Sequence, residues 1–201
     1  MELILASASP RRAELMRMCG YDFTVIPSAA DEGKPAADDP AGIVMHLSVL
    51  KAAKVMESLP PERRRNAVVI GSDTVVVVDG RILGKPRTRE EAIEMLRTES
   101  GRWNHVYTGV AVLRMLVEDA GERCVGKADF DTAGVRFAAM TDEEIEAYVA
   151  TGEPMDKAGA YGIQGRSSMF IDRIEGSFYT VVGLPVHLLY RMLKDVGIEA
   201  F

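Results

Sequence analysis

The sequence has few cysteines, few histidines and no long run of apolar residues. Among its 201 residues are two cysteines and three histidines, and Cys19 and Cys124 lie far apart, outside any Cys-x-x-Cys or Cys/His pair. A thiolate zinc site needs such pairs, so the spacing argues against one, and unpaired cysteines fit a reducing cytosol. No apolar stretch approaches the roughly 20 residues that cross a bilayer. We therefore expect a cytoplasmic protein with no membrane partner.

Aromatic residues and positive charge are also limited. Aromatic side chains make up 6% of the chain, and 24 Lys and Arg against 30 Asp and Glu give a formal charge of -6. A negatively charged protein repels a polyanion unless its basic residues cluster, so we do not expect non-specific nucleic-acid binding. The remaining composition, 47% hydrophobic and 27% charged, is typical of a soluble globular protein with one substantial core. We expect a single domain over residues 1–201, without internal repeats.

Apolar periodicity and turn residues predict a mixed α/β fold. Strands are expected over residues 3–6, 67–70, 75–78, 81–85, 106–117, 123–137, 169–174 and 179–182, with a turn around 119–121. Helices are expected to begin at Pro10, Asp39–Pro40, the capping boxes Thr88-x-x-Glu91 and Thr141-x-x-Glu144, and Pro185.

In the helix that begins at Pro40, the spacing predicts an apolar stripe that ends at Lys54. Its members are Ile43, Leu47, Leu50 and Lys54. Lys51 lies on a neighbouring stripe with Val44 and Val55, a position from which its side chain is able to point toward the core.

The first predicted helix carries two cations at its amino-terminal turn. If Ser9 caps this helix, Arg11 and Arg12 fall in the first turn, where the positive end of the helix dipole disfavours each cation by about 0.3–1 kcal/mol. An anion beside the arginines removes this penalty. With Ser7 nearby, the segment is typical of a phosphate pocket that follows a strand. An ordinary helix cap with solvated arginines is the alternative.

A predicted β-hairpin gathers a second polar group. Asp79–Gly80 favours a two-residue turn, and counting back from it places Thr74 opposite Lys85, with Asp73 beside both. A carboxylate, a hydroxyl and an ammonium at the open end of a hairpin are able to hold a metal-bound phosphate. A hairpin that simply ends in polar residues is the alternative. Further along, the glycine-rich residues 159–165 predict a loop that either approaches a ligand closely or is a plain turn.

Six segments, in order along nearly the whole chain, resemble the Maf family of nucleoside triphosphate pyrophosphatases. They are residues 5–12 (LASASPRR), 71–76 (GSDTVV), 84–86 (GKP), 100–102 (SGR), 106–110 (VYTGV) and 152–165 (GEPMDKAGAYGIQG). The chain departs from the family pattern at His46, Ser48 and residues 103–105. Because the segments match in both order and spacing, the resemblance is specific.

The resemblance implies a fold similar to that of the inosine triphosphate pyrophosphatases: a mixed sheet with two lobes around a central cleft. It also implies a cytoplasmic homodimer that hydrolyses nucleoside triphosphates to monophosphate and pyrophosphate with magnesium or manganese. Residues 73–76 and 161–165 look like the branch that acts on dTTP and UTP. The alternatives are the sibling branch that acts on 7-methyl-GTP and a nucleotide-binding regulator of septum formation.

The resemblance also assigns site residues by position. Asp73 matches the family's proton acceptor, and Arg11, Thr74 and Gln164 match its specificity positions. The other cleft positions correspond to Ser7, Arg12, Glu32, Lys51 and Lys85. Glu32 and Asp73 together offer the carboxylate oxygens that magnesium prefers, although Asp31-Glu32-Gly33 is equally typical of a solvated acidic turn.

Overall fold

The computed structural model describes residues 1–33, 37–118 and 121–200, and they divide into two compact units. Unit one comprises Met1–Asp73, Thr108–Asp131 and Gly183–Phe201, and unit two comprises Thr74–Tyr107 and Thr132–Val182. The mixed α/β class predicted from the sequence is confirmed, whereas the turn expected around residues 119–121 falls largely outside the described residues.

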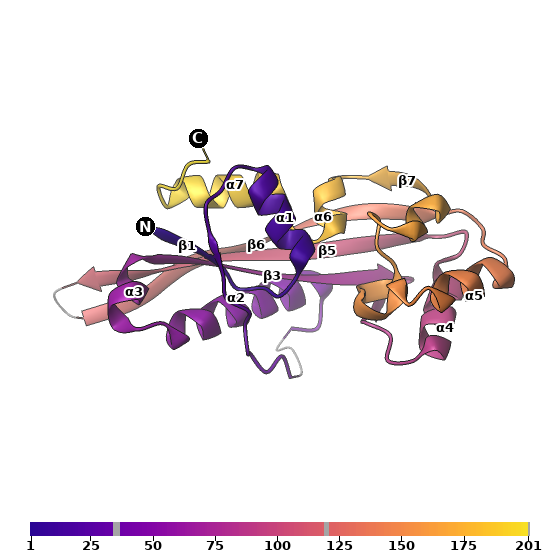
Figure 1. The fold of residues 1–201 in the computed structure, drawn as a ribbon, viewed down its shortest axis with the longest axis horizontal. Coiled ribbons are helices and arrows are strands. Elements are labelled where there is room, and N and C mark those ends of the chain that lie inside the picture. Colours follow the sequence, from indigo (N-terminus) through magenta and orange to yellow (C-terminus); the bar gives the residue numbers. More distant parts are fainter. Residues whose placement is uncertain (34–36, 119–120, 201) are drawn as a thin grey trace. The chain divides into compact units, whose positions relative to one another are not determined.

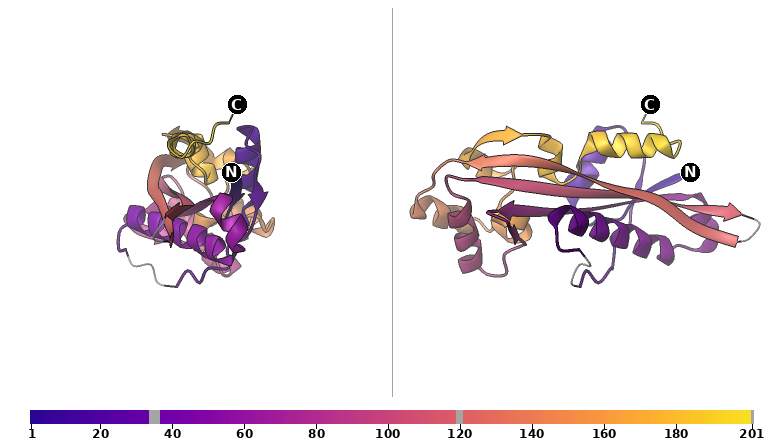
Figure 2. Two further views of the ribbon diagram at one scale, coloured as in Figure 1. Left: turned by 90° about the vertical axis from the view of Figure 1, so that its left-hand side faces the viewer. Right: turned by 180° about the vertical axis from the view of Figure 1, so that it is seen from behind.

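Unit one is built on a mixed sheet with helices on both faces. Its strands are β1 (Glu2–Leu5), β2 (Thr24–Val25) and parts of β3 (Ala67–Val78), β5 (Trp103–Glu118) and β6 (Gly121–Phe137). Its helices are α1 (Pro10–Met18), α2 (Pro40–Ser58), α3 (Pro61–Asn66) and α7 (Val186–Asp195). The strand order is β2-β1-β3-β5-β6, and β1 pairs in parallel with both β2 and β3. Figures 1 and 2 show α2 along one face of this sheet and α1 and α7 along the other.

The buried face of helix α2 is rotated from the predicted stripe and shares only Leu47 with it, since Ile43 and Leu50 are half-buried. Lys54, at the end of that stripe, is exposed, whereas Val44 and Val55 of the neighbouring stripe are buried. Lys51 lies between them and is half-buried, as its position on the neighbouring stripe suggested. The buried face packs on the apolar core formed with β1, β3 and β5.

Two glycines allow α2 to approach the sheet closely. A Cβ atom at Gly71 of β3 would lie 2.0 Å from the carbonyl oxygen of Ser48, and one at Gly109 of β5 would lie 2.4 Å from the carbonyl oxygen of Val44. Any side chain at these positions would collide with the helix backbone. The glycines therefore set the distance between α2 and the two strands beneath it.

Unit two combines the remaining parts of β3, β5 and β6 with a further set of elements. These are β4 (Arg81–Leu83), α4 (Arg89–Glu99), α5 (Asp142–Ala150), β7 (Ile171–Glu175), α6 (Phe178–Val182) and three short 3-10 helices, η1 (Glu153–Asp156), η2 (Ala158–Ala160) and η3 (Arg166–Phe170). The strand order is β4-β3-β5-β6-β7, and β4 and β7 are antiparallel to their neighbours. Helices α4 and α5 lie side by side (Figure 1) over an apolar core that includes Leu96, Phe137 and Ile145.

The predicted hairpin forms, but it is shorter than expected. Asp79 and Gly80 both have positive φ, 47° and 76°, as a two-residue turn of this kind requires. Strand β4 ends at Leu83, so the prediction that it extends to Lys85 and pairs that residue with Thr74 is wrong.

The chain leaves the hairpin after Leu83 because the backbone of Gly84 forms a hydrogen bond outside the hairpin. The carbonyl oxygen of Gly84 accepts a hydrogen bond of 3.0 Å from the N–H of Gly159, in the glycine-rich segment. Pro86, which follows directly, has no N–H to donate to a ladder. The sequence around Lys85 is therefore drawn toward η2 rather than along β3.

Most helix starts are confirmed with their caps. The Asp39 side chain accepts from the N–H of Gly42, and Thr141 forms a complete capping box with Glu144. The box expected at Thr88 is half-formed, because the Glu91 carboxylate accepts from the N–H of Arg87 instead.

Two strand predictions need correction. Residues 67–70 and 75–78 belong to the single strand β3, because the intervening residues 71–74 are extended as well. Residues 179–182, predicted as a strand from their β-branched side chains, form helix α6, in which the N–H groups of Thr180 and Val181 bond to the carbonyl oxygen of Ser177. Local hydrogen bonds override β-propensity here. The short helix α3 was not predicted.

Candidate active site

The segment between β1 and α1 folds around the hydroxyl of Ser7. Ser9 occupies the capping position and Pro10 opens the helix, but the Ser9 side chain makes no capping hydrogen bond, so that part of the prediction is wrong. The buried Ser7 Oγ instead accepts from the backbone N–H of Ser9 at 3.2 Å and from Arg12 Nη1 at 3.1 Å. Ser7 thus fixes both the loop between β1 and α1 and the guanidinium of Arg12.

Arg12 connects three segments of unit one. Its Nε donates to the carbonyl oxygen of Gly183 at 2.7 Å, and Ser72 Oγ of β3 donates to the same oxygen at 3.2 Å. Burial lowers the pKa of Arg12, and the nearby Asp73 carboxylate opposes that shift. Arginine stays protonated in proteins, so a fixed positive charge lies near the middle of β3 and within the electrostatic reach of Asp73.

Asp73 and Glu32 converge on the ammonium of Lys51. Lys51 Nζ lies 2.5 Å from Asp73 Oδ1 and 3.0 Å from Glu32 Oε1. The side chains of Lys51 and Asp73 are 14% and 12% exposed, whereas that of Glu32 is 53% exposed. The Lys51–Asp73 pair is therefore largely shielded from solvent and salt, and Glu32 meets it from the solvent side.

The close approach of α2 to β3 explains this pair. Lys51 is three residues after Ser48 on the helix and therefore on the same face, and Asp73 is two residues after Gly71 on the strand and likewise on the same face. Since Gly71 lies directly beneath Ser48, the next turn of α2 places Lys51 over Asp73.

The carboxylates suit magnesium that is shared with a phosphate. Among residues 1–33, 37–118 and 121–200, no three His, Cys, Asp or Glu side chains form a group that could hold a metal ion. Asp73 and Glu32 nevertheless both face the ammonium of Lys51. Magnesium commonly takes one or two carboxylates from the protein, while substrate phosphates and water complete its shell. Glu32 and Asp73 would thus offer a divalent metal two carboxylate ligands.

The structure brings together five of the predicted residues, Ser7, Arg12, Glu32, Lys51 and Asp73, within unit one. Arg11, half-buried in the first turn of α1, belongs to the same unit.

The other three predicted residues belong to unit two. Thr74 is half-buried in β3, Lys85 is exposed after β4, and Gln164 is exposed in the turn of residues 162–165. That they share a cleft with Asp73 stays a prediction.

Sequence reasoning missed Gly183, which accepts from Arg12, and Ser72, which donates to the same carbonyl oxygen. Ser72 lies within the GSDT segment, where only its neighbours Asp73 and Thr74 carried a predicted role. Gly183 contributes a carbonyl oxygen, and no side-chain pattern marks a backbone acceptor.

None of the helices in the three described ranges is both long enough and apolar enough to span a membrane.

Comparison with known proteins agrees with the resemblance seen in the sequence. The family model described as "Maf-like protein" matches residues 2–196. The chain belongs to the Maf family. Among Maf-family relatives, the dTTP/UTP pyrophosphatase of Symbiobacterium thermophilum is 48% identical over 200 residues, which cover 100% of this chain and 96% of the relative. The dTTP/UTP pyrophosphatase of Bacillus anthracis is 44% identical over 198 residues, covering 98% and 97% of the two chains.

Unit one thus combines two kinds of group. Arg11 and Arg12 lie at the start of α1, and cations at such a helix terminus are suited to polyphosphate ligands. Asp73 presents a carboxylate, a group that can accept a proton from water, and Lys51 holds that carboxylate in place. Cationic groups and a carboxylate therefore lie in one compact unit.

Proposed function

We propose that this chain hydrolyses dTTP and UTP to the nucleoside monophosphate and pyrophosphate. The observation that carries the proposal is the meeting of Arg12, Lys51 and Asp73 in unit one, which combines phosphate-binding cations with a buried carboxylate. The substrate class follows from the relatives, which are named dTTP/UTP pyrophosphatases and match nearly the whole chain.

In the proposed reaction, water attacks the α-phosphorus and the bond to the oxygen bridging the α- and β-phosphates breaks. Asp73 orients the water and accepts its proton. Negative charge then grows on the departing pyrophosphate, where Arg11 and Arg12 offset it. Lys51 fixes the Asp73 carboxylate through the 2.5 Å contact.

A divalent cation, magnesium or manganese, belongs to the proposal. Glu32 and Asp73 would hold it, and it would neutralise phosphate charge and activate the attacking water. Lys51, which pairs with both carboxylates and offsets one of their two negative charges, would remain beside them.

Recognition of the pyrimidine ring is assigned to Gln164. A primary amide offers a donor and an acceptor side by side, and thymine and uracil present a ring N–H next to a carbonyl. Thr74 and Lys85 are proposed to contact the sugar or phosphates of the same nucleotide. We also propose that the chain acts as a cytoplasmic homodimer, which sedimentation at several concentrations tests.

The deciding experiment measures pyrophosphate release from dTTP, UTP, GTP and 7-methyl-GTP with magnesium or manganese. We expect turnover of dTTP and UTP, and a loss of 100-fold or more in kcat, an order-of-magnitude figure for a lost general base, in Asp73→Asn. The matched control is Asp195→Asn, since Asp195 pairs with Lys127 elsewhere in unit one at 3.6 Å. This variant should keep activity within about twofold of wild type, as exposed ion pairs contribute little.

The other outcomes are equally informative. Release from no triphosphate with either ion would favour the nucleotide-binding regulator, and a preference for 7-methyl-GTP would favour the sibling branch. If Asp73→Asn turned over dTTP as fast as Asp195→Asn, Asp73 would not be the proton acceptor.

A further inference from the structure

Gln164 lies at the tip of a tight turn in unit two. The N–H of Gly165 donates to the carbonyl oxygen of Gly162 at 2.7 Å, so residues 162–165 form a closed turn. Ile163 is buried, whereas the Gln164 side chain is exposed. Because no burial orients this amide, its direction depends on the backbone of the turn.

Ser167 holds the turn at its first residue. Its hydroxyl accepts from the N–H of Gly162 at 3.1 Å and donates to the carbonyl oxygen of the same residue at 2.9 Å. Ser167 is fully buried. Both backbone polar groups of Gly162 are thus bound to one side chain that has no freedom to move away.

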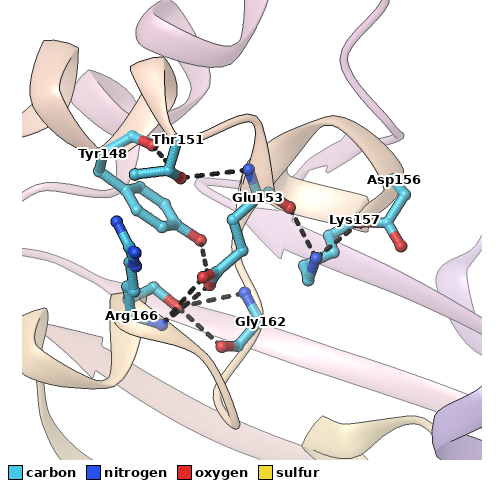
Figure 3. A network of polar contacts seen from close by, with 8 residues as sticks. Tyr148, Thr151, Glu153, Asp156, Lys157, Gly162 and Arg166 are labelled. Carbon is cyan, nitrogen blue, oxygen red and sulfur yellow. Dashed lines mark hydrogen bonds and ion pairs between the residues drawn. The ribbon is translucent and has the colours of Figure 1, made fainter.

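Glu153, the first residue of η1, holds the other end of the turn (Figure 3). Its Oε1 and Oε2 accept from the backbone N–H of Arg166 at 3.0 and 3.1 Å, and the Tyr148 hydroxyl donates to Oε1 at 3.1 Å. A Cβ atom at Gly165 would lie 2.0 Å from Glu153 Oε1, so only glycine admits the carboxylate here. Burial raises the pKa of Tyr148, which keeps its hydroxyl a donor.

Lys157 connects the same two segments from a second side (Figure 3). Its Nζ donates to the carbonyl oxygen of Glu153 at 2.6 Å and contacts Asp156 Oδ1 at 2.6 Å. A Cβ atom at Gly162 would lie 2.5 Å from Lys157 Cε, so the lysine stem lies directly against the turn. The 3-10 helix η1 therefore serves as the support on which the turn rests.

We propose that Glu153 is a positioning residue for substrate specificity: by holding the backbone of Arg166, its carboxylate fixes the turn that presents Gln164 to the pyrimidine. The inference rests on the proposed function, since it takes Gln164 as the group that reads the base. Glu153 itself touches no substrate. A small displacement of the turn would leave the Gln164 amide unable to satisfy the ring N–H and the carbonyl of the base together.

The test compares kcat and KM for dTTP and dCTP, because cytosine presents an acceptor ring nitrogen beside an amino group where thymine presents a ring N–H beside a carbonyl. Glu153→Ala should lower the dTTP-to-dCTP ratio of kcat/KM about tenfold, mostly through KM for dTTP, as loss of one substrate hydrogen bond predicts. Glu153→Gln should stay within about threefold of wild type, because its amide oxygen still accepts from Arg166 and its amide nitrogen can donate to Tyr148. Gln164→Ala should match Glu153→Ala, and the double variant should lose nothing further.

A matched control removes a similar carboxylate that lies elsewhere in the same unit. Glu144 accepts from the backbone N–H of Thr141 at 2.8 Å, so Glu144→Ala should cost stability without changing the dTTP-to-dCTP ratio. An unchanged ratio in Glu153→Ala, or an equal loss on the Gln164→Ala background, would overturn the positioning role. If Glu153→Ala does not fold, Glu153→Asp withdraws the carboxylate and must lower the ratio in the same way. Failure of wild type to hydrolyse dTTP or UTP would instead refute the proposed function.

Discussion

Glu99, at the end of α4, should make the protein less stable as the pH rises from acid to neutral. Its side chain is 0% exposed, and its Oε1 accepts a long hydrogen bond of 3.5 Å from Asn104 Nδ2. Within the described part of the chain, no group bonds Oε2. Burial raises the pKa of Glu99 well above its ordinary 4.5, so the folded protein keeps this carboxyl protonated at a pH where the unfolded chain releases the proton.

The sign and size of the effect follow from this difference. Below the unfolded pKa both states are protonated and the carboxyl causes no loss. Between the unfolded and folded pKa values, each pH unit lowers the free energy of unfolding by about 1.4 kcal/mol, because the folded state binds the extra proton. Tyr161, the titratable neighbour of this group, has a pKa raised by its own burial and by Glu99, so it does not ionise in this range.

Urea unfolding of wild type and Glu99→Gln from pH 4 to pH 7 measures the effect. Glutamine has the same shape and never ionises, so the variant should gain relative stability by about 1.4 kcal/mol per pH unit above the ordinary carboxyl value, until the pH reaches the folded-state pKa of Glu99. The control is Glu94→Gln, which replaces an exposed side chain on the same helix and should change stability by no more than about 0.5 kcal/mol. A constant difference between wild type and Glu99→Gln over the whole range would refute the reasoning.

Three further variants test the packing and the site. Gly71→Ala should cost about 1–3 kcal/mol in urea unfolding through overpacking against α2. It should also lower kcat, because a displaced α2 would move Lys51 away from Asp73; unaltered kinetics would argue against this link between helix position and the Lys51–Asp73 pair. Arg12→Lys should lower kcat/KM for dTTP about tenfold, because an ammonium lacks the fork that reaches both Ser7 and Gly183; wild-type values would show that charge alone suffices. Thr141→Ala should cost about 1 kcal/mol in thermal unfolding with unchanged kcat, and no loss would mean that the capping box adds nothing.

The sequence was a good guide wherever local chemistry decides the structure. The turn at Asp79–Gly80 and the capping box at Thr141 depend on residues two to four positions apart, and both appear in the structure. Predictions failed where a distant partner competes. Strand β4 stops early because Gly159 bonds to Gly84, some 75 residues before it in the chain, an interval that follows from the sequence numbering. No local pattern marks such a partner.

The sequence indicated which residues the candidate site contains, but not which groups hold them in place. Charge and helix position indicated Arg12 as a phosphate ligand, and the family resemblance indicated Asp73. The groups that hold Arg12 in place, however, include the carbonyl oxygen of Gly183, which is 171 residues away. Nor did the sequence identify Glu153 as the support for Gln164, because its carboxylate accepts from the backbone N–H of Arg166, a group that every residue except proline carries.

The largest error in the strand prediction concerns the residues that build the site. Residues 71–74 looked like a break between two strands, because Gly71, Ser72 and Asp73 disfavour a central strand. In the structure they continue β3, and each departure from strand preference corresponds to a contact: Gly71 admits α2, Ser72 bonds to Gly183, and Asp73 meets Lys51. A buried strand with poor local propensity persists because its neighbours satisfy those polar groups. Residues that disfavour a strand therefore indicated the position of the candidate site here, and not the end of a strand.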